Sequence, residues 1–215
     1  MSQELLSLLH TVNPYDGFAP PYPLDLQGWH GTAPIFAELI EKKKPKLVIE
    51  VGTWMGQSAA TMGQELRKYG GKLICVDTWL GSTEFWLDLG NESRYRALKL
   101  QNGYPQVYYR FLSNMAHLRL QDTVIPFPQT SANAARVLAK KGVEAGLIYI
   151  DASHEEGDVL MDLQGYWPLL EDGGMMFGDD WTGWPGLKSD VQAFADKMGL
   201  AVAVSEDQQF WMIQG

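Results

Sequence analysis

Residues Leu47–Ser58 read LVIEVGTWMGQS, and this stretch decides the predicted fold. It starts with an apolar run, Leu47–Ile49, is interrupted by Gly52 and Gly56, and takes on helical spacing from about Ser58. A buried parallel strand that leads through a tight turn into a helix has this pattern. In doubly wound α/β folds, ligands bind beyond the carboxyl end of the first strand. The sequence therefore predicts a ligand-binding loop between the two glycines.

The spacing of this loop narrows the kind of ligand that it can bind. Dinucleotide-binding loops read G-x-G-x-x-G, and their middle glycine lets the backbone approach a pyrophosphate. Here Trp54 fills that position, and the sequence has no P-loop GK[ST] motif. A nucleoside-like ligand without a phosphate chain remains, and Glu50 at the strand end suits a cationic amine. The glycines are also compatible with a tight turn that binds nothing, so the loop alone leaves both interpretations open.

Composition and charge disfavour several classes of protein. The chain has 215 residues, enough for one well-buried α/β domain and few for two. Its formal net charge of −9 disfavours nucleic acid and anionic membranes as partners, because both need a basic surface. The single cysteine, Cys75, argues against a disulfide framework and suits a reducing compartment. The N-terminal segment is too short and too polar for a signal peptide or a membrane span, so we expect a cytoplasmic protein.

Apolar strands and amphipathic helices alternate along most of the chain. Strands are expected at 47–49, 72–79, 123–128, 147–152 and 175–178, followed by an antiparallel pair at 200–204 and 209–213. Helices are expected at 33–43, 58–69, 104–118, 131–141 and 155–170, and again from residue 187. The alternation predicts a single-domain, Rossmann-like α/β fold with a mostly parallel seven-stranded sheet and helices on both faces. Residues 1–45 are expected to form N-terminal helices and an irregular arm packed on the core formed by residues 46–215.

Two polar residues follow the second and third predicted strands. Asp77 ends the second strand, about 25 residues after Gly52, near the place where α/β nucleotide folds put an acid against the ribose hydroxyls. The alternative is that Asp77 caps the next turn. Ser131 begins a helix after the third strand, and the loop before it is placed to contact the base of a ligand. The glycine loop and Asp77 together favour a nucleoside ligand.

Acidic residues follow the fourth and fifth predicted strands. Asp151 ends the fourth strand, and the pair Asp179–Asp180 ends the fifth. In a doubly wound order these strands neighbour the first, so the three carboxylates converge and favour a bound Mg²⁺, Mn²⁺ or Ca²⁺. His154 is placed to act as a general base with an unperturbed pKa of about 6.5. Alternatively, these acids cap turns and His154 merely starts a helix.

Three motifs carry a resemblance to a known family. They are EVGTWMGQS at 50–58, CVDTW at 75–79, and IDASHEEGDVLMDLQGYWPLLEDGGMMFGDDW at 150–181. The chain resembles a class I S-adenosylmethionine-dependent methyltransferase over residues 45–215. The last motif is similar to the small metal-assisted branch that includes macrolide-sugar O-methyltransferases and cephalosporin hydroxylase-like proteins. The resemblance implies that residues 46–215 form an S-adenosylmethionine-binding methyltransferase domain.

The resemblance also implies a role for individual residues. The glycines border the methionine part of the cofactor, Asp77 holds the ribose, and Ser131 lies at the adenine edge. The full set that it places at the cofactor is Glu50, Gly52, Gly56, Ser58, Asp77, Trp79, Ser131 and Asp151. Asp151, Asp179 and Asp180 would bind Mg²⁺, and His154, with Asp151 beside it, would accept the proton of the substrate hydroxyl. Asp179 departs from the family pattern, because relatives often have the longer Glu there.

The activity expected from the resemblance is O-methylation of a small hydroxylated metabolite by S-adenosylmethionine, assisted by Mg²⁺. Two alternatives stay open: a hydroxylase-like enzyme of the same fold, and a cofactor-binding protein without catalytic activity. The expected partner is a small-molecule acceptor, with neither nucleic acid nor membrane. The sequence does not name the acceptor or the oligomeric state, and a homodimer is compatible with it.

Overall fold

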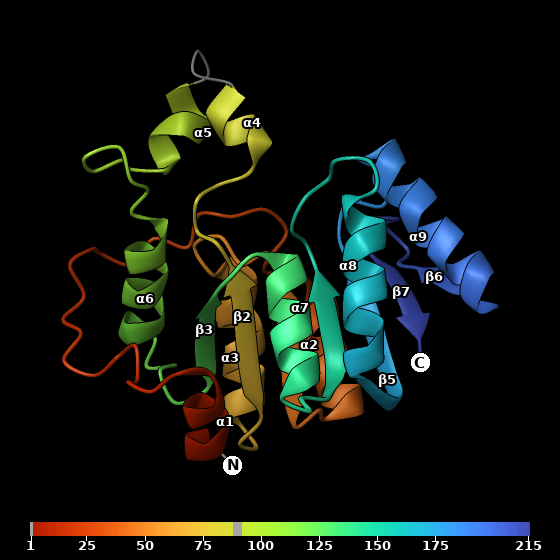
Figure 1. Cartoon of the computed structure of the whole chain (residues 1–215), viewed down its shortest axis with the longest axis horizontal. Helices are drawn as coiled ribbons and strands as arrows, with labels where there is room; N and C mark the ends of the chain where they lie inside the picture. Colours follow the sequence, from red (N-terminus) through yellow and green to blue (C-terminus); the bar gives the residue numbers. More distant parts are fainter. Residues whose placement is uncertain (1, 88–91) are drawn as a thin grey trace.

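A computed structural model describes residues 2–87 and 92–215, and it contains a seven-stranded sheet in the order β3-β2-β1-β4-β5-β7-β6 (Figure 1). The first five strands are parallel, and β7 runs antiparallel to both β5 and β6. The strands are β1 Leu47–Val51, β2 Lys72–Asp77, β3 Val124–Pro128, β4 Ala145–Ile150, β5 Leu170–Gly178, β6 Val202–Val204 and β7 Trp211–Gln214. The predicted fold class and the neighbouring positions of the first, fourth and fifth strands are therefore confirmed.

Helices cover both faces of this sheet. They are α1 Ser2–Leu9, α2 Pro34–Lys43, α3 Gln57–Arg67, α4 Thr83–Leu87, α5 Glu92–Ala97, α6 Val107–His117, α7 Ser131–Lys140, α8 Asp158–Tyr166 and α9 Pro185–Met198. Side chains of α7, α8 and α9 form one buried cluster with the sheet, and side chains of α2, α3 and α6 form another. In β1, Ile49 and Val51 belong to the first cluster and Val48 to the second. A strand buried on both faces needs apolar residues in succession, which explains the run at the start of β1.

The structure differs from the prediction in several local details. The helix predicted at 155–170 is shorter, since α8 gives way to a 3-10 turn and β5 already starts at Leu170, which pairs with Ala145 across an irregular register. Thr130, not Ser131, caps α7, because its hydroxyl accepts a hydrogen bond from the backbone N–H of Asn133. The short helices α4 and α5 were not predicted. They stand above β2 and β3 in the view of Figure 1.

The segment between α1 and α2 crosses the surface without regular structure and is fixed by hydrogen bonds. The Tyr15 hydroxyl donates to the carbonyl of Val124 at 3.2 Å, and the backbone N–H of Asp25 donates to the Asn114 side chain at 2.9 Å. This path brings Trp29 to the carboxyl edge of the sheet. Within the described residues, no helix is both long enough and apolar enough to cross a membrane.

Candidate functional site

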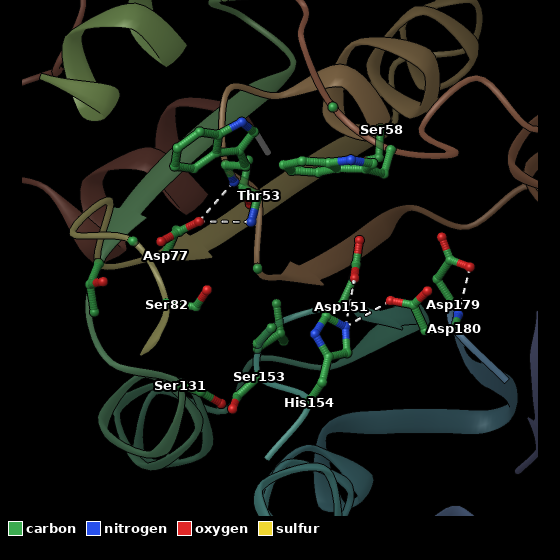
Figure 2. A pocket seen from close by; sticks show the side chains of 18 of the residues that line it. Thr53, Ser58, Asp77, Ser82, Ser131, Asp151, Ser153, His154, Asp179 and Asp180 are labelled. Atoms are coloured by element: carbon green, nitrogen blue, oxygen red, sulfur yellow. Dashed lines mark hydrogen bonds and ion pairs between the residues drawn. The ribbon is translucent and has the colours of Figure 1, made fainter. Parts of the chain in front are cut away.

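A cavity of about 380 Å³ lies at the carboxyl ends of β1, β2, β4 and β5 (Figure 2). It has a glycine-loop end, formed around Gly52, Thr53 and Asp77, and a carboxylate end, formed around Asp151, Asp179, Asp180 and His154. The parallel registers of β1 with β2 and of β1 with β4 place these strand ends side by side. The predicted convergence of separate strand ends on one pocket is therefore what the structure shows.

Gly52 is required at its position by the packing of the loop. Its φ of +86° lies in the left-handed region, and an added Cβ would lie 1.9 Å from the carbonyl oxygen of Asp151. Only glycine avoids both the backbone strain and this overlap. The loop after β1 can therefore pass directly against the end of β4, which joins the two ends of the cavity.

Asp77 holds the glycine loop in place and also lines the cavity. Its Oδ2 accepts hydrogen bonds from the backbone N–H groups of Thr53 and Trp54 at 2.9 and 2.8 Å (Figure 2). Its Oδ1 accepts one from the backbone N–H of Trp79 at 2.7 Å. Burial raises the pKa of this carboxyl, whereas the backbone donors oppose that rise. The turn-capping interpretation is correct, and the carboxylate nevertheless lines the cavity.

Glu50 does not line the cavity, so the structure corrects the expectation that it meets a cationic amine or the cofactor. Its side chain is fully buried on the α3 side of the sheet, where it accepts hydrogen bonds from the hydroxyls of Ser58 and Thr53 and from the Cys75 thiol. Burial raises the pKa of Glu50 to about 8, although these donors oppose the shift. Ser58 does line the cavity, as predicted, at the start of α3.

Gly56 and Trp79 also lie outside the cavity lining, contrary to the prediction. An added Cβ on Gly56 would lie 2.8 Å from side-chain atoms of Phe111 and Met115, so this glycine permits close packing of α6. The Trp79 side chain is buried, packs against Phe111 at a centroid distance of 5.0 Å, and donates from Nε1 to the carbonyl of Trp54 at 2.8 Å. Both residues support the glycine loop on the side that faces α6, away from the cavity.

Ser131 lines the cavity at the start of α7, as the sequence predicted. Its hydroxyl donates to the carboxylate of Asp162 on α8, and its carbonyl accepts a hydrogen bond from Tyr166 at 3.1 Å. Burial raises the pKa of Asp162 to about 6. These contacts fix Ser131 at the side of the cavity that Asp77 also borders.

His154 is held between two carboxylates at the other end (Figure 2). Its Nε2 lies 2.8 Å from Oδ2 of Asp180 and 3.7 Å from Oδ1 of Asp151, and the Trp184 ring stacks on it at 5.0 Å. Burial would lower the pKa of His154, but the two carboxylates outweigh burial and raise the pKa to about 10. The predicted unperturbed pKa is therefore wrong for this arrangement, in which the imidazole is a cation at neutral pH.

The three predicted metal ligands fall into two overlapping groups. Ligand atoms of Asp151, His154 and Asp180 lie within 4.8 Å of one another, and so do those of His30, Asp179 and Asp180. Asp180 belongs to both groups. Carboxylate and imidazole donors in this arrangement are able to bind a divalent cation.

Asp179 is the most buried of these acids, at 3% exposure, and its contacts come from distant parts of the chain. It accepts a hydrogen bond from the Gln209 side chain, and Nδ1 of His30 lies 3.3 Å from its Oδ2. Burial and the nearby charge of Asp151 raise the pKa of Asp179 to about 6. Neither His30 nor Gln209 was among the site residues predicted from the sequence, because no local motif marks either residue.

Four of the nine described non-glycine residues with a positive φ lie in the lining of this cavity or directly behind it. His30, Trp54, Trp79 and Asp180 all have φ between +50° and +62°, in the left-handed region that non-glycine residues rarely adopt. Such conformations persist where the surrounding structure enforces them, and they cluster at functional sites. His30, Trp54 and Asp180 line the cavity and Trp79 lies behind it, so strained backbone is present at both ends of the cavity.

Comparisons with known proteins agree with this geometry. A model described as a methyltransferase domain matches residues 49–181, more than half of the chain. A search of the curated proteins found no match. Among solved structures, the O-methyltransferase NovP is similar, with a TM-score of 0.63 and 18% identity, over 100% of this chain and 99% of that one.

Two further solved structures are similar and hold a cofactor. The O-methyltransferase TomG from Streptomyces achromogenes, in complex with S-adenosylmethionine, has a TM-score of 0.59 and 13% identity over 99% of this chain and 94% of that one. An O-methyltransferase from Bacillus cereus, in complex with S-adenosylhomocysteine, has a TM-score of 0.57 and 14% identity over 100% of this chain and 90% of that one. These likenesses concern the fold, whereas the family is given by the matching domain model. The chain belongs to the methyltransferase domain family.

Proposed function

We propose that this protein transfers a methyl group from S-adenosylmethionine to a hydroxyl of a small molecule, with a divalent cation held at the carboxylate end of the cavity. The observation that carries this proposal is the union of both ends in one cavity: Asp77 at the glycine loop, and Asp151, His154 and Asp180 beside it. Membership of the methyltransferase domain family and the cofactors bound by similar structures support the choice of cofactor.

The residues of the glycine-loop end fit a nucleoside with a positively charged sulfur. The cavity volume of about 380 Å³ is in the range of sites for small molecules. Its carboxylates, from Asp77, Glu84, Asp151, Asp179 and Asp180, favour a cationic ligand. S-adenosylmethionine supplies an electrophilic methyl group on a sulfonium ion, which an oxygen nucleophile attacks in line.

The residues of the carboxylate end fit a divalent cation. Asp180 belongs to both candidate groups, with Asp151 and His154 on one side and His30 and Asp179 on the other. Such a cation supplies Lewis-acid polarisation of the acceptor hydroxyl. Asp151 and Asp180 are its proposed ligands, and Asp179 takes part through the second group.

His154 is the proposed acceptor of the hydroxyl proton. Only a neutral imidazole accepts a proton, and the carboxylates of Asp151 and Asp180 keep His154 protonated in this arrangement. A divalent cation held by these carboxylates would offset their charge and lower the pKa of the imidazole toward neutrality. The Trp184 ring stacks on the imidazole of His154, with the ring centroids 5.0 Å apart, and thereby holds the imidazole in its orientation.

Isothermal titration calorimetry with S-adenosylhomocysteine tests the cofactor assignment. We expect one site with a dissociation constant of about micromolar order, weakened about tenfold or more by Asp77→Ala. Asp122→Ala, which removes an exposed acid far from the cavity lining, is expected to leave the affinity unchanged. No binding to the wild type at millimolar concentrations would overturn the proposal.

Product mass then identifies the reaction. Incubation with S-adenosylmethionine, Mg²⁺ and a panel of hydroxylated small molecules is expected to add about 14 mass units to an acceptor, since a methyl replaces a proton. A hydroxylase-like activity would instead add about 16 mass units, the mass of one oxygen. Cofactor binding without any turnover that depends on Asp151 would indicate a non-catalytic protein.

A further inference from the structure

A second pocket adjoins the cavity described above and has the opposite charge. Trp29, Phe85 and Arg94 line both of them. The second pocket is lined by four basic side chains and one acid, in a chain whose formal net charge is −9. These charged residues are Asp25, Arg94, Arg96, Lys99 and Arg110.

Arg94 occupies the boundary between the two pockets. Its guanidinium lies over the Trp29 ring, 5.9 Å from the ring centroid. Among the side chains that the structure describes, no carboxylate lies within ion-pair distance of Arg94, and no other Lys or Arg lines the first cavity. A guanidinium stacked on an aromatic ring keeps its N–H groups free to bind a carboxylate or phosphate in a bidentate manner.

Arg110 provides an independent sign that the second pocket takes a ligand. The residue is 9% exposed and pairs with Asp25 through Nη2. Its Nε is buried and has no hydrogen-bond partner among the described residues. A buried donor without a partner costs free energy, and an anion in the pocket would satisfy it.

We propose that the methyl acceptor carries an anionic group, a carboxylate or a phosphate, which binds Arg94 at the junction of the two pockets. This inference rests on the proposed function, because it concerns the substrate of that same cavity. The carboxylates of Asp77, Glu84, Asp151, Asp179 and Asp180 repel an anion from the first cavity. The anionic end of the acceptor therefore points to the basic pocket, and Trp29 and Phe85 flank the middle of the molecule. Its hydroxyl is thereby oriented toward Asp151 and His154.

Calorimetry with two matched catechols tests the inference on protein saturated with S-adenosylhomocysteine and Mg²⁺. Protocatechuate carries a carboxylate, and protocatechuamide has a neutral amide of nearly the same shape in its place. We expect the wild type to bind protocatechuate about tenfold more tightly or better, and added salt to reduce this preference. In Arg94→Gln the two affinities should become about equal. Arg136→Gln, which removes an exposed charge on α7, should keep the preference.

The outcomes separate the two proposals. If S-adenosylhomocysteine itself does not bind the wild type, the proposed function fails. If it binds, but the wild type shows no preference for the carboxylate, or binds neither catechol at millimolar concentrations, only the anionic acceptor is overturned. A preference that Arg94→Gln retains, or that salt does not reduce, would also overturn it. The affinity of Arg94→Gln for S-adenosylhomocysteine reports whether the variant is folded.

Discussion

The two ends of the cavity are built in opposite ways. At the glycine-loop end, neutral backbone N–H groups surround Asp77 and hydroxyls surround Glu50, so that the polar atoms are paired within the chain. At the carboxylate end, Asp151, Asp179 and Asp180 gather around two histidines. At the first end the shape is already fixed by these internal hydrogen bonds. At the second end the negative charges outnumber the positive ones, which favours the binding of a cation. Under the proposed function, the cofactor is therefore positioned by shape and the reacting groups by charge.

Substitution of Gly52 is expected to break the first end most severely. In Gly52→Ala, the new Cβ would overlap the carbonyl oxygen of Asp151, and the residue would keep an unfavourable positive φ. We expect urea denaturation to show a loss of about 3 kcal/mol or more in the free energy of unfolding, because the overlap involves backbone that cannot move aside cheaply.

Gly70→Ala is the matched control for this change. Gly70 has a φ of +83° and no neighbouring atom within 4 Å of an added Cβ. Gly70→Ala should therefore lower the free energy of unfolding only by the strain of the left-handed conformation, about 1–2 kcal/mol. Equal losses in the two variants would show that the loop does not depend on close contact with the end of β4.

The dependence of stability on pH tests whether the buried Glu50 carboxyl, beneath the glycine loop, is neutral. The pKa of Glu50 is about 8 in the folded protein and near 4.5 in the unfolded chain. Between these values the folded state holds a proton that the unfolded state has released, so this group favours folding less and less as the pH rises. Glu50→Gln should remove this fall in the free energy of unfolding, which amounts to at most about 5 kcal/mol over the whole range.

Urea denaturation of the wild type and of Glu50→Gln across this pH range provides the measurement. The two curves of unfolding free energy against pH are expected to diverge from about pH 4.5 to about pH 8, with the wild type falling more steeply. Parallel curves would mean that Glu50 is ionised in the folded protein.

A thermal-shift measurement with Mg²⁺ tests whether the carboxylate end of the cavity binds a cation. At about a hundredfold excess over its dissociation constant, a bound cation stabilises the fold by about 2.7 kcal/mol, which raises the melting temperature. Asp180→Asn should abolish this rise, because Asp180 is shared by both candidate ligand groups. Asp172→Asn, at an exposed position of β5, should retain it. An equal rise in all three proteins would place cation binding elsewhere.

The sequence predicted the architecture and those site residues whose position follows from the ends of parallel strands. Gly52, Asp77, Asp151 and Asp180 end or follow strands that lie side by side, so their convergence depends on topology alone. Glu50 was misplaced because alternation along β1 turns its side chain to the α3 face, beneath the loop and away from the ligand.

The remaining site residues depend on tertiary contacts that no local pattern records. His30 reaches Asp179 through an irregular segment, and Gln209 reaches the same carboxylate from the turn before β7. Likewise, the elevated pKa of His154 follows from the short distances to Asp180 and Asp151, which the predicted convergence of the carboxylates did not specify. Trp79 was assigned to the cofactor by the family resemblance, yet its ring packs against Phe111 on α6.

A crystal structure with S-adenosylhomocysteine and Mg²⁺ tests the central claim most directly, namely that one cavity holds the cofactor at one end and the reacting groups at the other. We expect the ribose hydroxyls at Asp77, the sulfur between the Gly52 loop and His154, and the cation on Asp180. A ligand bound outside this cavity, or a sulfur that faces away from Asp151 and His154, would contradict the claim.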